Sequence, residues 1–246
     1  MRRVLPLAGL VTLGLVAACG SAPAPPVPVP TGTHLVAEWR QGPGFMNIDA
    51  GPMDTPDLAV YSDGEVVARA HRTLTLAPSE LDALLSALRQ DLIGLPPTAD
   101  NTQQFLFGDG SMTTLTVVDA DGTAHIVQAY ALDVLRDYPD RLVAAMDLMI
   151  HLAARVTKEG SRYTSDRVRL VAEYFDGSRD FQAWPEDVPS PTGAHSVWIS
   201  KLSGAEAAAV VRAWPADRPG SGAEAWVKTA DGAKYLVEWR YLLPHE

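Results

Sequence analysis

The chain has 246 residues, a formal net charge of −10 at pH 7 and a single cysteine. An acidic balance of this size makes nucleic acid an unsuitable partner and disfavours direct adsorption to anionic lipid. A single cysteine excludes a disulfide bond within the chain, so the core must be held by packing alone. The length permits either one large domain or two small ones.

The first 18 residues have the layout of an export signal. Arg2 and Arg3 precede an apolar run from Leu5 to Ala18, which is shorter than the roughly 20 residues that a membrane-spanning helix needs. Cys19 follows directly after Leu15-Val16-Ala17-Ala18. This arrangement resembles the lipobox of bacterial lipoproteins. The alternative is an ordinary secretory signal with a chance cysteine.

The resemblance implies that residues 1–18 are removed and that Cys19 becomes the mature N-terminus. It would then carry a thioether-linked diacylglycerol, often with a further acyl chain, and two or more chains anchor a protein stably where one alone is marginal. Gly20 stands in place of the aspartate that would signal retention at the inner membrane of a two-membrane cell. We therefore expect an exported protein, anchored to the cell membrane at Cys19, with its domain on the extracytoplasmic side.

Residues 19–33 are expected to form a tether. Prolines at positions 23, 25, 26, 28 and 30 block helix and sheet and favour extended polyproline II. At about 3.1 Å per residue, the stretch would hold the domain roughly 30–40 Å from the lipid. A ligand for a proline-binding module is the weaker alternative. With its arginine, alanine and proline bias, the whole chain is similar to uncharacterised lipoproteins of high-GC Gram-positive bacteria, a resemblance that transfers no functional residue.

Four Asp-Gly pairs lie between strand-like runs. Each predicts a tight β-hairpin, because both turn positions of that hairpin type need positive φ. The pairs are Asp63-Gly64, Asp121-Gly122, Asp176-Gly177 and Asp231-Gly232. The spacing between the first two almost equals the spacing between the last two, which indicates an internal duplication.

A helix is expected between the hairpins of each half. In the first half, five leucines share one helical face, at positions 81, 84, 85, 88 and 92. In the second half, Ser203 and Glu206 predict a capping box, and Pro215 ends the helix. Its apolar positions repeat the spacing of four of the leucines, at Ala207, Val210, Val211 and Trp214. A further helix is expected from about Pro139 to Val156.

These patterns predict an α+β fold with two similar ββαββ units, in which antiparallel sheets carry helices packed on one face. The first unit and the extra helix are expected to occupy residues 34–158. The second unit is expected to occupy residues 159–246. The two units could share one core.

The sequence contains none of the motifs that name a common hydrolase, metalloprotease, phosphate-binding or dinucleotide-binding site. We therefore expect no catalytic motif, cofactor or metal site. The segment from Val117 to Gln128 partly resembles a calcium loop, but its first and twelfth positions lack the required oxygen ligands, so a hairpin is the simpler explanation. The six histidines show no ligand-like spacing, at positions 34, 71, 125, 151, 195 and 245.

Two identical tripeptides, Glu38-Trp39-Arg40 and Glu238-Trp239-Arg240, lie on expected strands near the two ends of the domain. With Glu173, they offer carboxylates beside aromatic rings, which could serve glycan binding or hydrolysis. Simple strand alternation explains the same pattern, with tryptophan toward the core and the charged residues toward water. We favour the alternation.

The longest irregular stretch runs from Trp184 to Ala194, and Trp198 lies just beyond it. Long loops that carry aromatic residues often bind a ligand or a partner, so Trp184 and Trp198 mark a candidate binding loop. A divergent hairpin connection would look the same.

The sequence thus predicts a lipid-anchored envelope protein that acts as a non-catalytic binding or interaction module. Its expected partners are the membrane, through the N-terminal lipid, and another envelope protein or a small ligand. One alternative is a cell-wall or carbohydrate-active enzyme that uses strand carboxylates such as Glu38 and Glu173. A second alternative is an inhibitor or immunity-type protein, whose acidic charge would suit a basic target.

Overall fold

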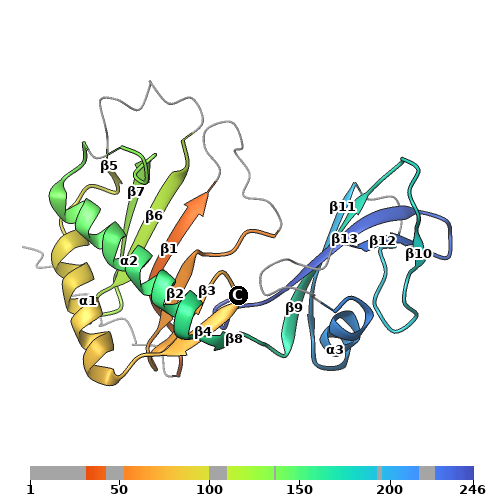
Figure 1. Ribbon diagram of the computed structural model, residues 1–246, viewed down its shortest axis with the longest axis horizontal. Helices are drawn as coiled ribbons and strands as arrows, with labels where there is room; N and C mark the ends of the chain where they lie inside the picture. Colours follow the sequence, from red (N-terminus) through yellow and green to blue (C-terminus); the bar gives the residue numbers. More distant parts are fainter. Residues whose placement is uncertain (1–31, 43–52, 100–109, 136, 193–195, 216–224) are drawn as a thin grey trace, which may run out of the picture.

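The computed structural model describes residues 32–42, 53–99, 110–135, 137–192, 196–215 and 225–246 (Figure 1). Within these residues it has three helices and two mixed sheets, one of eight strands and one of five. The predicted α+β class is therefore confirmed. The expected signal segment, Cys19 and most of the expected tether lie outside the described residues.

The larger sheet, sheet A, has the strand order β5-β7-β6-β1-β2-β3-β4-β8. All neighbouring strands are antiparallel except β5 and β7. The strands are β1 (Leu35–Gly42), β2 (Leu58–Tyr61), β3 (Glu65–Ala68), β4 (Arg72–Thr75), β5 (Thr98–Ala99), β6 (Met112–Val118), β7 (Ala124–Tyr130) and β8 (Ser161–Arg162).

Helices α1 (Pro78–Leu92) and α2 (Asp140–Glu159) lie side by side on one face of sheet A (Figure 1). The five leucines predicted to share a helical face are all buried in α1. On α2, the buried residues include Leu142, Met146 and Met149. Sheet A, α1 and α2 form what we call the first lobe, whose core is one continuous apolar cluster.

The smaller sheet, sheet B, has the strand order β10-β12-β13-β9-β11. Its strands are β9 (Arg167–Tyr174), β10 (Gln182–Ala183), β11 (Val197–Ser203), β12 (Ala225–Lys228) and β13 (Lys234–Tyr241). Helix α3 (Gly204–Ala213) packs on one face through Ala207, Ala209 and Val210. Sheet B and α3 form the second lobe, which has a separate core cluster.

Three of the four Asp-Gly pairs lie at hairpins as predicted, but the predicted turn with positive φ at both positions is wrong, because only the glycine of each pair has positive φ. Gly64, Gly122 and Gly232 have φ between 88° and 92° and lie between the paired strands β2–β3, β6–β7 and β12–β13. The prediction for Asp176-Gly177 is wrong, because β9 pairs with β11 and β13 while β10 pairs with β12. The Phe175 ring packs on Trp226 of β12, with 4.6 Å between ring centroids.

The predicted capping box of α3 is also wrong. Ser203 is the N-cap residue, but its side chain makes no capping hydrogen bond. One half of such a box occurs at α1, where the Glu80 carboxylate accepts from the Ala77 N–H at 2.9 Å, while the Ala77 side chain has no acceptor for the other half. The two lobes differ in strand number, strand order and helix number, so the structure does not confirm two similar ββαββ units.

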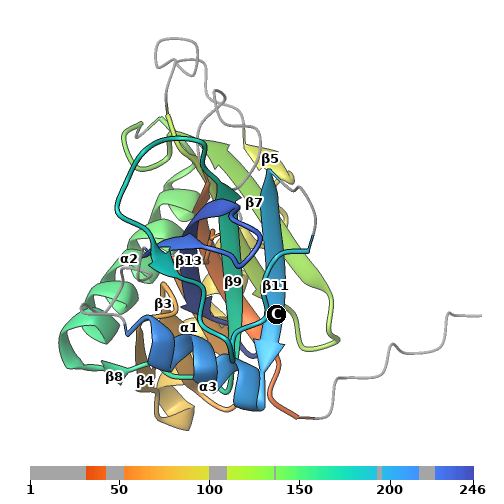
Figure 2. The ribbon, with the colours of Figure 1, turned by 90° about the vertical axis from the view of Figure 1, so that its right-hand side faces the viewer.

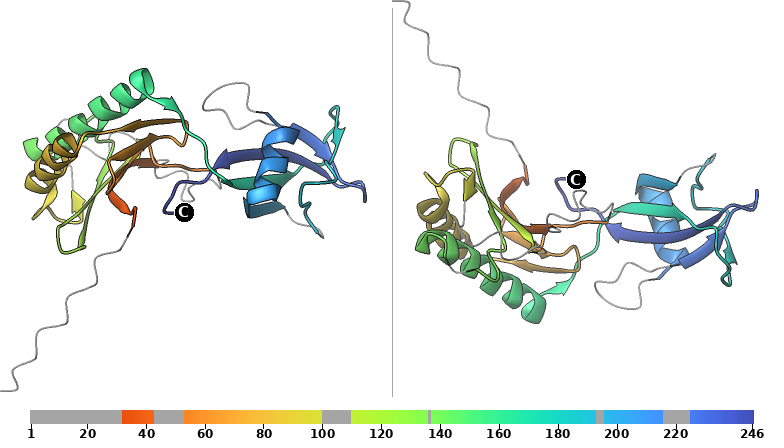
Figure 3. Two further views of the ribbon diagram at one scale, coloured as in Figure 1. Left: turned by 90° about the horizontal axis from the view of Figure 1, so that it is seen from below. Right: turned by 90° about the horizontal axis from the view of Figure 1, so that it is seen from above.

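The chain crosses between the lobes twice. It leaves sheet A after β8 and enters β9, and after β13 it returns, so that its last described residues lie between the lobes (Figures 1 and 3). A third apolar cluster forms at this place, where Leu243 packs with Tyr61, Val67 and Tyr163. The joint between the lobes thus has an apolar core of its own.

Candidate functional site

A group of interacting ionisable side chains lies at the joint between the lobes. We call it the junction cluster. It comprises Glu38, Arg40, Tyr61, Arg169, Arg240, His245 and Glu246.

Strand alternation explains how the two Glu-Trp-Arg tripeptides reach this place. Trp39 is 7% exposed in the first-lobe core and Trp239 is 2% exposed in the second-lobe core. The charged residues next to each tryptophan therefore point to the other face of the strand, away from the core that the tryptophan enters. Glu38 and Arg240 meet the C-terminal segment there, and Arg40 pairs with Glu38. The favoured alternation is confirmed for both tryptophans. The expectation that the charged residues face water is wrong for Arg240, which is 5% exposed, and for Glu38, whose side chain is 13% exposed, because the C-terminal segment covers them.

Glu246 is the centre of one half of the cluster. Its two carboxylate oxygens each accept from Arg240 at 2.7 Å, and one also accepts from the Leu243 N–H at 2.9 Å. Burial alone would raise the pKa of Glu246, but the hydrogen bonds from Arg240 and Leu243, with the charges of Arg240 and Arg169, lower it to about 2. Arg240 also donates to the Asp54 carbonyl at 2.9 Å, and so reaches the first lobe.

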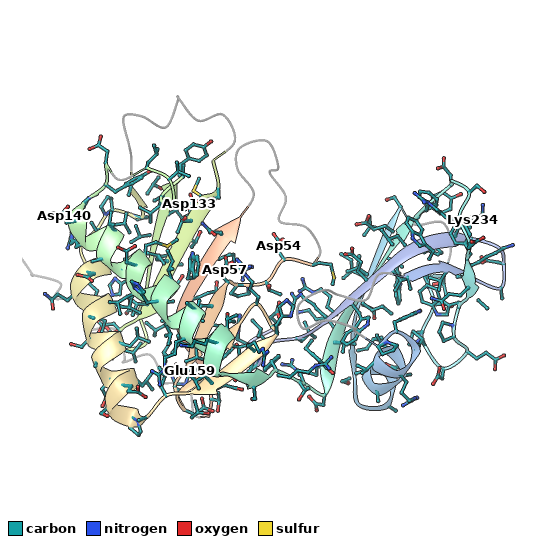
Figure 4. The ribbon with its side chains drawn as sticks, viewed as in Figure 1. Asp54, Asp57, Asp133, Asp140, Glu159 and Lys234 are labelled. Atoms are coloured by element: carbon teal, nitrogen blue, oxygen red, sulfur yellow. The ribbon has the colours of Figure 1, made fainter. Side chains whose placement is uncertain are left out.

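Figure 4 shows Asp54 and Asp57 on the segment that leads into β2, on the side of the first lobe toward the second. The Asp57 carboxylate accepts from the Gln41 N–H at 2.7 Å and from Arg69 Nε at 2.9 Å. These bonds fix the start of β2 beside β1. The Asp54 carbonyl that accepts from Arg240 therefore belongs to a segment that the bonds of Asp57 hold in place.

His245 is the centre of the other half. Its Nδ1 lies 2.8 Å from the Tyr61 hydroxyl, and its Nε2 lies 3.5 Å from a Glu38 oxygen. Burial lowers the pKa of His245, although the carboxylates of Glu38 and Glu246 oppose this effect. A neutral imidazole with its proton on Nε2 accepts from Tyr61 and faces Glu38 with its N–H.

The Tyr61–His245–Glu38 chain has the outline of a nucleophile, a base and an orienting carboxylate. Tyr61 is however completely buried, and burial raises the pKa of its phenol far above the ordinary value. A nucleophile needs access to a substrate and a lowered pKa. These three side chains are therefore suited to joining the lobes, since Tyr61 and Glu38 belong to sheet A and His245 follows sheet B.

The structure does not bring the proposed carboxylate pair together by any contact that it describes. Glu38 belongs to sheet A, where Arg40 Nε lies 3.3 Å from its carboxylate. Glu173 is exposed near the end of β9, opposite Val197 and Leu236 in sheet B. Glu238 lies in β13 opposite Val171.

Trp184 and Trp198 do lie close to each other, with ring centroids 6.4 Å apart. Trp184 also contacts Trp214 and Tyr235 edge to face, at 5.7 Å and 6.2 Å between centroids, and its indole N–H donates to the Val188 carbonyl. Both tryptophans are partly buried against the second-lobe core. The arrangement orders the connection between β10 and β11, of which residues 193–195 lie outside the described residues.

Two concave surfaces lie beside α2. An open groove of about 430 Å³ between α1 and α2 has an apolar floor that includes Leu84 and Leu152, with His151 and Arg155 at its rim. A smaller pocket of about 230 Å³ lies between α2 and sheet A, beside Trp39. Among the described residues, the indole N–H of Trp39 has no hydrogen-bond partner.

The described residues contain no group of three or more histidine, cysteine, aspartate or glutamate side chains that could hold a metal ion. In the segment compared with a calcium loop, Asp119 and Asp121 accept backbone N–H groups of the turn itself. None of the helices described is long and apolar enough to cross a membrane.

Comparisons with protein-family models, with curated proteins and with solved structures find no match to this chain. The geometry of the chain itself is therefore the basis on which its function is inferred. Sequence reasoning named Glu38, but it missed Glu246 and the role of His245. No local motif marks His245, because its partners Tyr61 and Glu38 lie more than a hundred residues earlier in the chain. Glu246 binds nearby Arg240 and Leu243, but no known motif describes this contact.

Proposed function

We propose that this protein is a lipid-anchored protein of the bacterial cell envelope, and that its two-lobed domain is a non-catalytic binding or interaction module. The expected anchor is Cys19, with residues 19–33 as the tether and the domain on the extracytoplasmic side. The partner would be another envelope protein or a small ligand.

The side chains of the junction cluster bind one another, and this observation supports the non-catalytic part of the proposal. A general acid or base works with a pKa near the operating pH and with open space for a substrate. Glu246 instead has a pKa of about 2 and is occupied by Arg240 and a backbone N–H. Tyr61 is completely buried. The ionisable groups that are perturbed most strongly here serve to hold the lobes together.

The anchor is tested by Cys19→Ala in the full chain. We expect the variant to fold and to appear in the soluble fraction or the medium, because the acyl chains that would hold it have no attachment site. Fractionation and immunoblotting measure the distribution. Retention of the variant in the membrane fraction at the same level as the chain that keeps Cys19 would rule out anchoring at Cys19.

The interaction role is tested by crosslinking in intact cells, affinity capture and mass spectrometry. A specific protein captured in near-stoichiometric amount from the anchored chain, and in lower amount from Cys19→Ala, would support an envelope partner. Turnover of purified cell-wall glycans that is lost in Glu38→Gln, with Glu173→Gln as the companion variant, would contradict the non-catalytic proposal. Both variants remove a charge at constant shape.

A further inference from the structure

The free edge of sheet B differs from the other sheet edges that the structure describes. Sheet A ends in β5 and β8, and sheet B ends on one side in β10, each with only two residues. On its other side sheet B ends in β11, which has seven residues without proline or glycine. Short edge strands and prolines are common protections against pairing with another chain. Strand β11 has neither.

The backbone hydrogen bonds show which residues of β11 face outward. The Ser196 carbonyl accepts from the Tyr174 N–H, and the Gly204 N–H donates to the Asp166 carbonyl. Because hydrogen-bonded pairs alternate along an antiparallel ladder, the even-numbered residues between them also point to β9. The N–H and C=O groups of Val197, Ile199 and Lys201 therefore point away from β9, at the margin of sheet B (Figure 2).

The side chains at this edge are apolar and exposed. Val197 and Ile199 are 44% and 52% exposed. Their neighbours opposite in β9 are Glu173 and Val171, whereas the α3-facing cluster holds Val168, Leu170 and Ala172. Val197 and Ile199 thus lie on the face of sheet B that α3 leaves uncovered. An edge strand that combines outward backbone groups with exposed apolar side chains is a template for another strand.

We propose that β11 pairs antiparallel with β11 of a second copy of this chain, about a two-fold axis that passes between the two Ile199 residues. This register opposes Ile199 to Ile199 and Val197 to Lys201, and these outward residues exchange N–H···O=C bonds. It joins the two five-stranded sheets into one. The inference is independent of the proposed anchor and binding role.

The charges at this edge favour a second copy. Lys201 is the one charged residue of β11. Antiparallel pairing places the two lysines roughly 14 Å apart, at about 3.4 Å per residue. Each lysine then lies across from Val197 of the other copy, whose neighbour in β9 is the exposed Glu173. An acidic side chain of the second copy therefore lies on the same face of the joined sheet as each lysine, two strands or about 10 Å away.

The position of the first lobe also permits this pairing. Lys201 donates to the Glu246 carbonyl at 2.8 Å, so the Lys201 end of β11 is the end near the junction cluster. Antiparallel strands run in opposite directions. The two first lobes would therefore lie at opposite ends of the joined sheet, away from the two-fold axis.

The test uses the full chain with Cys19→Ala, so that no native thiol is present. Ile199→Cys is introduced in one sample. The matched control is Ile126→Cys, because Ile126 is 48% exposed and also lies in a strand, β7. The Cα atoms of a directly opposed pair, about 5.5 Å apart, suit a disulfide. Mild oxidation should convert the Ile199→Cys chain to a covalent dimer and leave the control monomeric.

Analytical ultracentrifugation of the Cys19→Ala chain provides the second readout. We expect a concentration-dependent species of twice the monomer mass, which Ile199→Lys reduces to the monomer mass without loss of thermal stability. A monomer at all concentrations, or equal crosslinking of the two cysteine variants, would overturn the proposal. So would exclusive crosslinking of Ile199→Cys to a different protein in cells, an outcome that would nevertheless support the proposed interaction role.

Discussion

At the scale of single residues, Arg240 is a side chain of the junction cluster that binds both lobes. It is 5% exposed, binds both oxygens of Glu246 and donates to the first-lobe carbonyl of Asp54. A buried ion pair adds little compared with a well-packed apolar pair, but removal of one partner leaves the other charge uncompensated. Removal of Arg240 is therefore expected to cost more stability than the ion pair itself contributes.

We predict that Arg240→Ala lowers the free energy of unfolding by roughly 3–5 kcal/mol, because Glu246 loses both hydrogen bonds in a buried place. The matched control is Arg212→Ala. Arg212 binds Asp187 at 2.8 Å, but the two side chains are 65% and 60% exposed, and such a pair contributes about 1 kcal/mol or less. Urea denaturation at neutral pH measures both losses. Equal losses in the two variants would contradict the assigned role of Arg240.

Glu246 leads to a prediction about pH. Its pKa in the folded chain is about 2, below the ordinary value of 4.5. Its contribution to stability is therefore complete above pH 4.5 and disappears as the pH falls toward 2, with a total of about 3 kcal/mol. We expect Glu246→Gln to be less stable at pH 7 and to show a shallower decline of unfolding free energy between pH 4.5 and 2. Parallel curves for the two proteins would refute this assignment.

At the scale of secondary-structure elements, two Asp-Gly hairpins offer a matched comparison. Gly64 and Gly122 both have φ of 88°. A Cβ at position 64 would lie 2.8 Å from the Leu76 carbonyl oxygen, whereas a Cβ at position 122 would have no atom within 4 Å. The β2–β3 hairpin thus has no space for a Cβ at position 64, whereas the β6–β7 hairpin has space for one at position 122.

We predict that Gly122→Ala costs roughly 1–2 kcal/mol, which is the penalty for a left-handed residue with a Cβ. Gly64→Ala should cost clearly more, because the same penalty applies and the backbone around Leu76 must also move. Thermal and chemical denaturation of the two variants measure the difference. A smaller loss for Gly64→Ala than for Gly122→Ala would show that the contact with Leu76 relaxes easily.

The sequence predicted those elements whose signal is local. The leucine spacing predicted α1, and three Asp-Gly pairs predicted their hairpins, because periodicity and positive φ depend on neighbouring residues. The hairpin between β3 and β4 was missed. Its turn uses Arg69 and Ala70 at φ of 49° and 54°, which no turn motif announces. It is stabilised by a distant group, since Arg69 binds the Asp57 carboxylate at 2.8 Å.

The junction cluster was beyond sequence reasoning for the same physical reason. The bond between Tyr61 and His245 joins residues 184 positions apart. Nothing in the residues around either one specifies the other, since the contact depends on the order of strands in two sheets. The alternation that placed Trp39 and Trp239 in the cores was predictable, and it was this alternation that turned Glu38 and Arg240 toward the joint.

At the scale of the whole molecule, the two lobes have separate cores but share the joint. Tyr163, just after β8, is 5% exposed, and its hydroxyl donates to the Leu242 carbonyl at 3.0 Å. Arg167 donates to the carbonyls of Leu243 and Pro244. The outgoing and returning segments are thus bonded to each other as well as to the first lobe. Unfolding of either lobe would expose this shared surface.

We therefore predict that the lobes unfold together, in one calorimetric transition whose calorimetric and van't Hoff enthalpies agree. Leu243 is fully buried in the joint, and Leu88 is 1% exposed in the first-lobe core. Both Leu→Ala variants should lose roughly 2–5 kcal/mol. Leu243→Ala should also separate the transition into two, because it weakens the surface that couples the lobes, while Leu88→Ala should leave a single transition at lower temperature. Two transitions in the unmodified protein would show instead that each lobe is stable without the joint.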